Sequence, residues 1–387
     1  MRCNAGETLE IRAGTIRGGD DHHSVRPADG GYSPDGASRS TVGQAVAVRK
    51  MRAMAVAATL AAAVPLLSCA SIPGIGPRRT DVWAFVAPWD SDSRTSGERN
   101  AACVGALVTG WVVLDSLTGQ PSLAFPDAAG RDSASETRGR RMMLVTSWAG
   151  DQFHPRAVLA LAADTGALGT ATREFARLAR EGGYRGVILD FEGHSRADVA
   201  ALGIVVRAFG RAARRVGAGP VAVAVPAADT AAYPARAFLT GAEFVMPMLY
   251  DEHWATSSPG AIASPEWVRR SLAVRVAESG ASRVVAALPL YGYMWRNGAL
   301  TQTVGYLESR AAATRAGVAL ERDAATSTLR ATRAGEWDLW VADAVLLQAL
   351  MREVERAGVR TVALWRLGLE DPTIWTTVLA RGAERGR

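Results

Sequence analysis

The chain has 387 residues, a formal net charge of +6 and 48% hydrophobic residues. Its positive and negative charges are interspersed, so the composition argues against a nucleic-acid-binding surface and we expect no nucleic-acid partner. The length would fit two or three average domains, although α/β barrels of this size also occur as one unit.

An export signal is predicted near the amino terminus. Residues 51–68 have a basic start followed by an apolar run of small side chains, which is the form of a secretory signal peptide. A proline and a serine interrupt this run, and it is too short to favour a membrane-spanning helix. Its end, "LLSC", resembles a bacterial lipobox. The resemblance implies cleavage before Cys69 and a lipid on the Cys69 thiol.

The predicted domain plan has four parts, of which the signal peptide is the second. Residues 1–50 show no hydrophobic period and indicate either a disordered leader or a misassigned start, with Met51 or Met54 as the true first residue. Residues 69–80 form a short tether, and residues 81–387 form one domain. The plan predicts an exported lipoprotein that is anchored to a membrane and faces the periplasm or the cell surface.

From residue 81 onward, short apolar segments alternate with amphipathic helical patterns. The apolar segments are "DVWAFVAPWD", "GALVTGWVVLD", "RMMLVTSW", "RGVILDFEG", "PVAVAVPAAD", "AEFVMPMLYD", "RVVAALPLYGYMW" and "RTVALWRLG". Helical patterns such as "SRADVAALGIVVRAFGRAARRVG" begin at a serine and end at a glycine. Eight strands alternating with helices predict an α/β fold of the closed (β/α)₈ TIM-barrel type. An open doubly wound sheet is the alternative, but no Gly-x-Gly-x-x-Gly follows the first strand.

One connection is long. Residues 296–340, between the seventh strand and the seventh helix, contain the alternating stretch "GVALERDAATSTLRATRAGEWDLW". This pattern predicts a small hairpin or subdomain inserted on the top face of the barrel. Long insertions at that face usually shape the binding cleft.

Acidic and aromatic residues gather where the predicted strands end. In a (β/α)₈ barrel these strand ends face the active site. Indole rings stack on sugar rings, and carboxylates bind hydroxyl groups or transfer protons, so this combination favours a carbohydrate site. The residues are Trp89, Asp90, Asp115, Trp148, Asp190, Glu192, Asp229, Tyr250, Asp251, Tyr291, Trp295 and Trp365.

Four motifs in this region resemble glycoside hydrolase family 18, the chitinase-like enzymes. "GVILDFE" at residues 186–192 resembles the family's fourth-strand signature, D-G-x-D-x-D-x-E. "MPMLYD" resembles the sixth-strand Met-x-Tyr-Asp, "LPLYGYMW" the seventh-strand segment, and "VALWRLGLED" the eighth-strand tryptophan with its glycine and acidic pair. The resemblance covers residues 81 to the carboxyl terminus. It is nearest in character to the cell-wall and exopolysaccharide N-acetylglucosaminidase branches.

The resemblance implies a glycosidase that cleaves β-linked N-acetylhexosamine polymers by substrate-assisted retaining catalysis. It implies that Glu192 is the general acid and that Asp190 orients the N-acetyl group of the substrate, whose carbonyl oxygen is the nucleophile. Tyr250 and Asp251 would bind the acetamido group, and Trp365 would form the floor of the sugar subsite. Further substrate contacts are expected from Tyr291, Trp295 and Trp89.

Two positions depart from the family pattern. The first aspartate of the signature is Arg185 here, and the middle aspartate is Ile188. Position 188 normally holds a polar group that bonds to the aspartate at position 190, so we expect Asp190 to lack that partner. A non-catalytic glycan-binding lipoprotein on the same barrel therefore stays open as an alternative. A scaffold that makes only protein contacts is a third reading, which the clustered acids and aromatics disfavour.

The sequence does not choose among peptidoglycan, chitin and poly-N-acetylglucosamine, nor between endo and exo cleavage. His22, His23, His154, His194 and His253 have no metal-ligand spacing, so no metal site and no cofactor are expected. His194 and His253 follow the fourth and sixth strands. They either border the cleft or lie in solvated loops.

Overall fold

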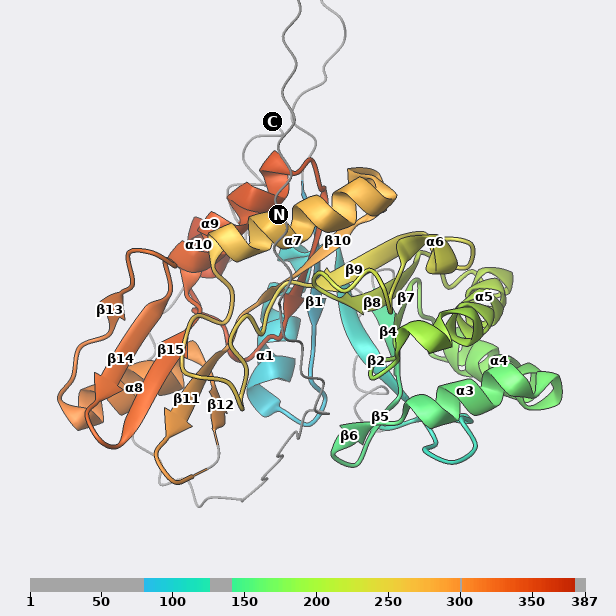
Figure 1. The fold of residues 1–387 in the computed structure, drawn as a ribbon, viewed down its shortest axis with the longest axis horizontal. Helices are drawn as coiled ribbons and strands as arrows, with labels where there is room; N and C mark the ends of the chain where they lie inside the picture. The colour runs from blue at the N-terminus through green and yellow to red at the C-terminus, as the bar shows by residue number, and fades with distance from the viewer. Residues whose placement is uncertain (1–79, 126–140, 300, 380–387) are drawn as a thin grey trace, which may run out of the picture. The chain divides into compact units, whose positions relative to one another are not determined.

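The computed structural model describes residues 80–125, 141–299 and 301–379. The predicted leader, the signal peptide, Cys69 and most of the tether lie outside these residues. In the part that is described, eight parallel strands close a barrel, which confirms the predicted (β/α)₈ fold (Figure 1). These strands are β1 (Asp81–Phe85), β2 (Ala106–Leu114), β4 (Arg141–Thr146), β7 (Val187–Asp190), β8 (Val221–Pro226), β9 (Phe244–Met248), β10 (Val285–Pro289) and β16 (Thr361–Trp365).

The barrel closes because its first strand pairs with two neighbours. β1 runs parallel to β16 on one side and to β2 on the other. The remaining barrel strands follow in chain order around the circle, so this set of strands has no free edge. Short additional strands flank it: β3 (Pro121–Leu123), β5 (Trp148–Ala149) and β6 (Gln152–Phe153).

Helices follow most barrel strands, and their starts agree with local sequence signals. Asp164 caps one of them by accepting hydrogen bonds from two backbone N–H groups, and Ser264 caps another. The barrel helices are α1 (Ser91–Asn100), α3 (Pro155–Ala163), α4 (Thr165–Glu181), α5 (Val199–Arg215), α6 (Ala235–Phe238), α7 (Pro265–Ser279), α9 (Ala344–Arg356) and α10 (Ile374–Thr377). Within the described ranges, three 3₁₀ turns accompany them: η1 (Ala101–Cys103), η2 (Arg196–Asp198) and η3 (Ala281–Arg283).

Side chains alternate between two apolar cores along each barrel strand. In β7, Val187 and Leu189 point outward into the core between barrel and helices. Ile188 points inward and is fully buried in a second core that fills the barrel interior. The alternation follows from the two-residue period of a strand. It means that residues 188, 190 and 192 lie on the inner side.

The predicted insertion is a separate antiparallel sheet with its own helix, α8 (Tyr306–Ala316). Its described strands are β11 (Gly292–Arg296), β12 (Gln302–Val304), β13 (Glu321–Arg322), β14 (Leu329–Arg333) and β15 (Trp337–Val341). One face of this sheet packs on α8 through an apolar cluster that includes Met294 and Leu339. Figure 1 shows the insertion in orange.

The predicted seventh strand is too long. It was expected to continue through "LPLYGYMW", but β10 ends at Pro289 and β11 of the insertion begins at Gly292. Gly292 pairs with Val341, so the chain enters and leaves the insertion at one place. The apolar run is continuous across two strands of different sheets, because both strands are buried, and hydrophobic pattern alone does not mark the break.

Among the described residues, no helix combines the length and apolar character needed to cross a membrane.

Candidate active site

Strand β7 carries the two predicted catalytic carboxyl groups to the carboxyl end of the barrel. Asp190 is the last residue of the strand, and Glu192 follows it. Between them, Phe191 is buried in the outer core, which anchors the chain at this point. Gly193 has a φ of 78°, a conformation that favours glycine and lets the chain turn directly after Glu192.

Asp190 has a hydrogen-bond partner on the neighbouring strand. Thr146 ends β4 directly opposite Asp190, and its Oγ1 donates to Asp190 Oδ2 over 3.0 Å. Burial raises the pKa of Asp190 to about 6, and hydrogen bonds with Thr146 and Glu192 oppose the rise. Ile188 lies in the apolar core of the barrel and gives Asp190 no polar contact, as expected, but the adjacent strand supplies another partner through Thr146.

The surroundings of Glu192 favour its protonated form. Burial raises its pKa well above the ordinary value, and the negative charges of Asp190 and Asp251 raise it further. A hydrogen bond joins the Glu192 and Asp190 carboxyl groups, which requires a proton on one of them. Asp190 Oδ1 is buried and receives no hydrogen bond from an N–H or hydroxyl group in the described part of the chain. A protonated Glu192 is therefore the donor that suits it.

Asp251 is held by two tyrosine hydroxyl groups. Tyr291 and Tyr293 both donate to its Oδ1, the second over 3.1 Å. Burial raises the pKa of Asp251, although the two hydroxyl groups oppose the rise. Asp251 also has a φ of 61°, a left-handed backbone that few residues other than glycine adopt. Such a conformation persists where surrounding contacts impose it, and it is a recurrent property of functional sites.

The predicted aromatic residues join these carboxyl groups into one cluster. The ring of Tyr250 lies 6.1 Å from that of Tyr291, and the ring of Tyr291 lies 5.4 Å from that of Tyr293. The negative charges of Glu192 and Asp190 contribute to a raised pKa of Tyr250, after the larger effect of burial. The structure thus brings together Asp190, Glu192, Tyr250, Asp251 and Tyr291. Trp365, at the end of β16, packs against the same aromatic cluster.

Trp295 lies in a different element from the one predicted. It belongs to β11 of the insertion and is only 8% exposed, packed 5.5 Å from the ring of Tyr293. Its indole Nε1 is buried without a hydrogen-bond partner in the described part of the chain. The expectation that Trp295 ends a barrel strand is wrong, for the reason given above for the seventh strand.

Trp89 is the exposed tryptophan of the predicted set. It follows β1, is 51% exposed, and packs edge to face on Trp111 with ring centroids 4.7 Å apart. The guanidinium of Arg366 lies 5.8 Å from the Trp89 ring centroid and also pairs with Asp90 over 2.5 Å. Burial opposes ionisation of Asp90, but Arg366 and the backbone N–H groups at the start of α1 outweigh it and lower its pKa. Trp89 therefore stands beside a compensated ion pair.

Three other strand-end residues have local roles. Asp115 and Asp229 each accept hydrogen bonds from backbone N–H groups two and three residues ahead, which fixes the turns after β2 and β8. Trp148 packs on Phe153 across the small β5–β6 pair. These contacts shape loops, and they show that position at a strand end does not by itself select site residues.

The two loop histidines differ from each other. His194 is buried, with its ring 6.5 Å from that of Tyr233, so it is neither a solvated loop residue nor one exposed at the site. His253 is half-buried and contacts the carbonyl oxygen of Ser258 through Nδ1. In the described residues no group of three or more histidine, cysteine or acidic side chains is placed to hold a metal ion.

Sequence reasoning missed three hydroxyl groups around the carboxyl cluster, those of Thr146, Tyr293 and Tyr233. Thr146 could have been predicted from the sequence, because it is a polar residue at the end of the strand that precedes β7 in the barrel. Tyr293 alternates with Tyr291 along the chain and could have been read as a second residue on the same side. Tyr233 lies in a loop after β8 and had no signal in the sequence pattern.

Comparison with known proteins gives a consistent picture. The fold matches that of a chitinase from Chromobacterium violaceum ATCC 12472 with a TM-score of 0.68 and 22% sequence identity, covering 79% of this chain and 99% of that one. It matches the spore cortex-lytic enzyme SleL of Bacillus megaterium QM B1551 with a TM-score of 0.68 and 20% identity, over 80% and 75% of the two chains. A class V chitinase from Nicotiana tobaccum in complex with NAG4 gives a TM-score of 0.63 at 17% identity, over 79% and 98%.

The barrel shares the fold of these chitinases. No family model matches the chain. Among curated proteins of Bacillus subtilis (strain 168), an uncharacterized glycosylase, YvbX, is 43% identical over 54 residues, which are 14% of this chain and 16% of that protein. The cortical fragment-lytic enzyme is 26% identical over 145 residues, 34% of this chain and 33% of that protein. The chain thus aligns with at most about a third of the length of these relatives, and the chitinase likeness of the whole barrel is one of fold.

Proposed function

We propose that this protein is a glycoside hydrolase of the chitinase-like type that cleaves β-linked N-acetylhexosamine polymers. One observation carries the proposal. At the carboxyl end of a barrel with the chitinase fold, the buried Glu192, whose pKa is raised well above its ordinary value, is hydrogen-bonded to Asp190, next to an Asp251 that two tyrosines hold in place. A buried carboxyl group with a raised pKa is the group that a glycosidase needs to protonate a leaving oxygen.

The spacing of the two carboxyl groups favours substrate assistance over a carboxylate nucleophile. In two-carboxylate glycosidases the groups stand about 5–5.5 Å apart when the configuration is retained and about 6.5–9.5 Å apart when it is inverted. Glu192 and Asp190 are in hydrogen-bond contact, which leaves no room for a sugar carbon or a water between them. Asp190 is therefore not spaced as a separate carboxylate nucleophile, and the acetamido group of an N-acetylhexosamine can supply one.

The proposed reaction proceeds in two steps. Glu192 gives its proton to the glycosidic oxygen while the bond from that oxygen to C1 breaks, and the acetamido carbonyl oxygen forms a bond to C1. Asp190 accepts a hydrogen bond from the acetamido N–H and stabilises the resulting oxazolinium cation. The Glu192 carboxylate then takes a proton from a water that attacks C1, the bond from C1 to the acetamido oxygen breaks, and the configuration is retained.

Substrate contacts are proposed on both sides of these carboxyl groups. Tyr250 and Asp251 would bind the acetamido group, and Trp365 would stack under the sugar ring. Tyr291, between β10 and β11, and Trp295 of the insertion would support them. The exposed ring of Trp89 offers a surface on which a further sugar residue can stack. The likeness to a chitinase in complex with NAG4 and to cortex-lytic enzymes supports a substrate that contains N-acetylglucosamine.

Substitution of Glu192 by glutamine tests the reaction. We expect wild type to release product from N-acetylglucosamine oligomers or from purified peptidoglycan, and Glu192→Gln to lose at least about 10³-fold in kcat, because the amide has no acidic proton to give. Glu308→Gln, an exposed change on α8, is the matched control and is expected to keep wild-type activity. If wild type binds the oligomers but releases no more product than Glu192→Gln, the protein is the glycan-binding alternative and the hydrolase proposal is wrong.

We further propose that the protein is exported and that Cys69 carries the lipid that anchors it to a membrane. The support is the signal-like segment at residues 51–68 and the lipobox-like "LLSC". Metabolic labelling with a fatty-acid probe should mark the wild-type protein and leave Cys69→Ser unmarked. Equal labelling of the two proteins would contradict the anchor.

A further inference from the structure

The hydroxyl group of Tyr233 lies between the two backbone groups that flank Glu192. It accepts a hydrogen bond from the His194 N–H over 3.0 Å and donates to the Phe191 carbonyl oxygen over 3.2 Å. Tyr233 is only 2% exposed, so both bonds are shielded from water. One hydroxyl group thereby fixes the backbone on both sides of the proposed general acid.

Glu192 needs such support because β7 ends before it. The last strand residue is Asp190, and Gly193 directly after Glu192 has a left-handed backbone. A segment outside a strand keeps its geometry only through contacts from other elements. Burial raises the pKa of Glu192 most, and the nearby Asp190 raises it further, so a shift of this segment that exposes the carboxyl to water or moves it from Asp190 would lower that pKa.

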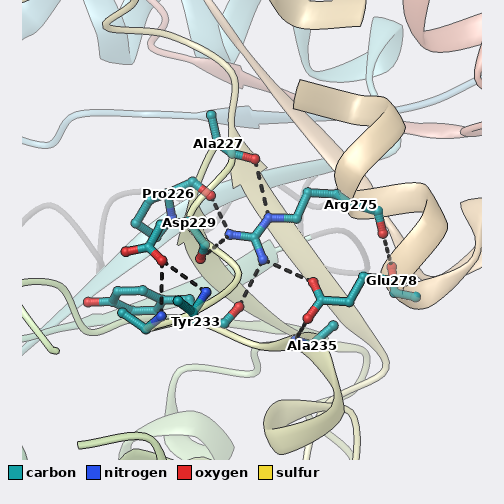
Figure 2. A network of polar contacts seen from close by, with 10 residues as sticks. Pro226, Ala227, Asp229, Tyr233, Ala235, Arg275 and Glu278 are labelled. Atoms are coloured by element: carbon teal, nitrogen blue, oxygen red, sulfur yellow. Dashed lines mark hydrogen bonds and ion pairs between the residues drawn. The ribbon is translucent and has the colours of Figure 1, made fainter. Parts of the chain in front are cut away.

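Tyr233 is itself held by a buried guanidinium. Arg275 on α7 is fully buried and donates to the Tyr233 carbonyl oxygen over 2.8 Å. The same group donates to three other carbonyl oxygens at the end of β8 and just after it, those of Pro226, Ala227 and Asp229, over 2.6, 3.2 and 2.9 Å (Figure 2).

The charge of this guanidinium is compensated within the same network. Arg275 contacts Glu278 Oε2 over 3.1 Å. The other oxygen of Glu278 accepts from the Ala235 N–H over 2.7 Å, at the start of α6 (Figure 2). The loop from β8 to α6 is thus tied to α7 at several points. A buried charge with so many partners fixes geometry, because each partner would be left unsatisfied if the loop moved.

We propose that Tyr233 is a positioning residue for Glu192, and that Arg275 acts on the proposed general acid through Tyr233. The inference rests on the proposed function, since it assigns Tyr233 a part in that reaction. It goes beyond the carboxyl cluster, because Tyr233 bonds to the backbone of Phe191 and His194 on either side of Glu192, and Arg275 bonds to Tyr233. The proposed series of contacts runs from Arg275 on α7, through Tyr233 in the loop between β8 and α6, to the residues that follow β7.

Tyr233→Phe tests the proposal with the smallest change, because it removes the hydroxyl group and keeps the packed ring. We expect kcat to fall about 10- to 100-fold with little change in KM, since a small displacement of a catalytic group has effects of this size. We also expect the alkaline limb of the pH profile of kcat/KM to move to lower pH. The Glu192 carboxyl would separate from Asp190 and gain water, and both changes lower its pKa.

Tyr184→Phe is the matched control. Tyr184 is also a buried tyrosine whose hydroxyl accepts a hydrogen bond, from Arg141 over 3.3 Å, but it lies near the start of β4 at the opposite end of the strands from the carboxyl cluster. It should lose a similar amount of stability while keeping its kcat and its pH profile. If Tyr233→Phe behaves like Tyr184→Phe, Tyr233 has a structural role only and the proposal is overturned.

A direct titration separates this proposal from the function itself. Infrared difference spectra between wild type and Glu192→Gln report the ionisation of the Glu192 carboxyl without any substrate. The proposal requires this carboxyl to ionise at lower pH in the Tyr233→Phe background than in wild type, even if no glycan is cleaved. An unchanged titration would overturn it, whatever the activity. If Tyr233→Phe does not fold, Arg275→Lys is titrated in its place and must shift the carboxyl in the same direction.

Discussion

At the scale of single residues, the central feature is a pair of buried, hydrogen-bonded carboxyl groups whose pKa values are both raised. Burial raises the pKa of both, and the hydrogen bond from Thr146 to Asp190 makes the two unequal. Asp190 is the member that ionises first, and its charge then keeps the proton on Glu192. Two carboxyl groups of the same kind therefore have different roles, with Glu192 as the acid and Asp190 as its charged neighbour.

The pH profile of wild type should show this inequality. We expect kcat/KM to rise with pH through about 6, as Asp190 ionises, and to fall only at a pH well above the usual range of a glutamic acid, as Glu192 loses its proton. Initial rates on a soluble N-acetylglucosamine oligomer over pH 4–10 would measure both limbs. A profile that falls steadily from about pH 4.5, the ordinary range of a glutamic acid, would contradict the assignment.

Thr146→Val tests the source of the inequality. Valine has nearly the same shape but cannot donate to Asp190, so the Asp190 carboxylate loses a stabilising hydrogen bond and its pKa rises. We expect the acidic limb of kcat/KM to move up by about one pH unit. Thr109→Val, which changes a buried threonine of β2 that accepts from Arg141, is the control and should leave the limb in place.

At the scale of elements, the insertion is tied to the barrel where α9 begins. Asp343 caps α9 by accepting from the Leu346 N–H over 3.0 Å. Its two carboxylate oxygens also bind the guanidinium of Arg322 from β13, over 2.8 and 2.5 Å. Because Asp343 is only 6% exposed, its charge depends on these partners. One side chain therefore ends the insertion and starts the next barrel helix.

Removing this junction should cost stability. We expect Asp343→Ala to lower the free energy of unfolding by about 1–3 kcal/mol, since a helix cap and a two-bond ion pair are lost together. Arg333→Ala breaks an exposed ion pair with Glu336 in the same insertion and should cost less than about 1 kcal/mol. Urea unfolding followed by circular dichroism measures both. Equal losses would show that the junction contributes no more than a surface pair.

At the scale of the whole molecule, the carboxyl cluster makes folding depend on pH. Asp190, Glu192 and Asp251 all have pKa values raised by burial, so the folded protein binds more protons than the unfolded chain between about pH 4 and the folded pKa of each group. Stability from these groups is fully present below about pH 4 and declines as pH rises. These three carboxyl groups therefore make the folded protein less stable at neutral pH than at about pH 4.

Glu192→Gln should therefore be more stable than wild type at neutral pH. Wild type must take up a proton at Glu192 on folding, whereas the glutamine amide is neutral in both states. We expect a higher Tm for the variant at pH 8, by a few degrees, and a difference that shrinks towards zero near pH 4. Differential scanning calorimetry at both pH values measures it. The hypothesis fails if the variant melts lower at pH 8 or if the difference is the same at pH 4.

Chain pattern alone predicted the barrel and the meeting of several carboxyl and aromatic side chains at one of its ends. The alternation of apolar strands and amphipathic helices predicted eight strands, all of which are present in the described residues, because burial on both faces of a barrel strand leaves an unmistakable apolar run. The placement of Asp190, Glu192, Tyr250 and Asp251 after strands predicted that they meet. Parallel strands of a closed barrel bring their carboxyl ends to one place, so strand-end position indicated where these residues lie, although it also selected Asp115, Asp229 and Trp148, which have local roles.

Only the tertiary structure decided how these groups interact. The hydrogen bond from Thr146 to Asp190 depends on the register of β4 against β7. The two hydrogen bonds of the Tyr233 hydroxyl on either side of Glu192 form only because the loop after β8 folds back to the end of β7. The end of β10 and the place of Trp295 depend on where one apolar run passes from the barrel into the insertion. Each is a contact between segments far apart in the chain. Hydrophobic period records which side of an element is buried, but it does not record which partner buries it.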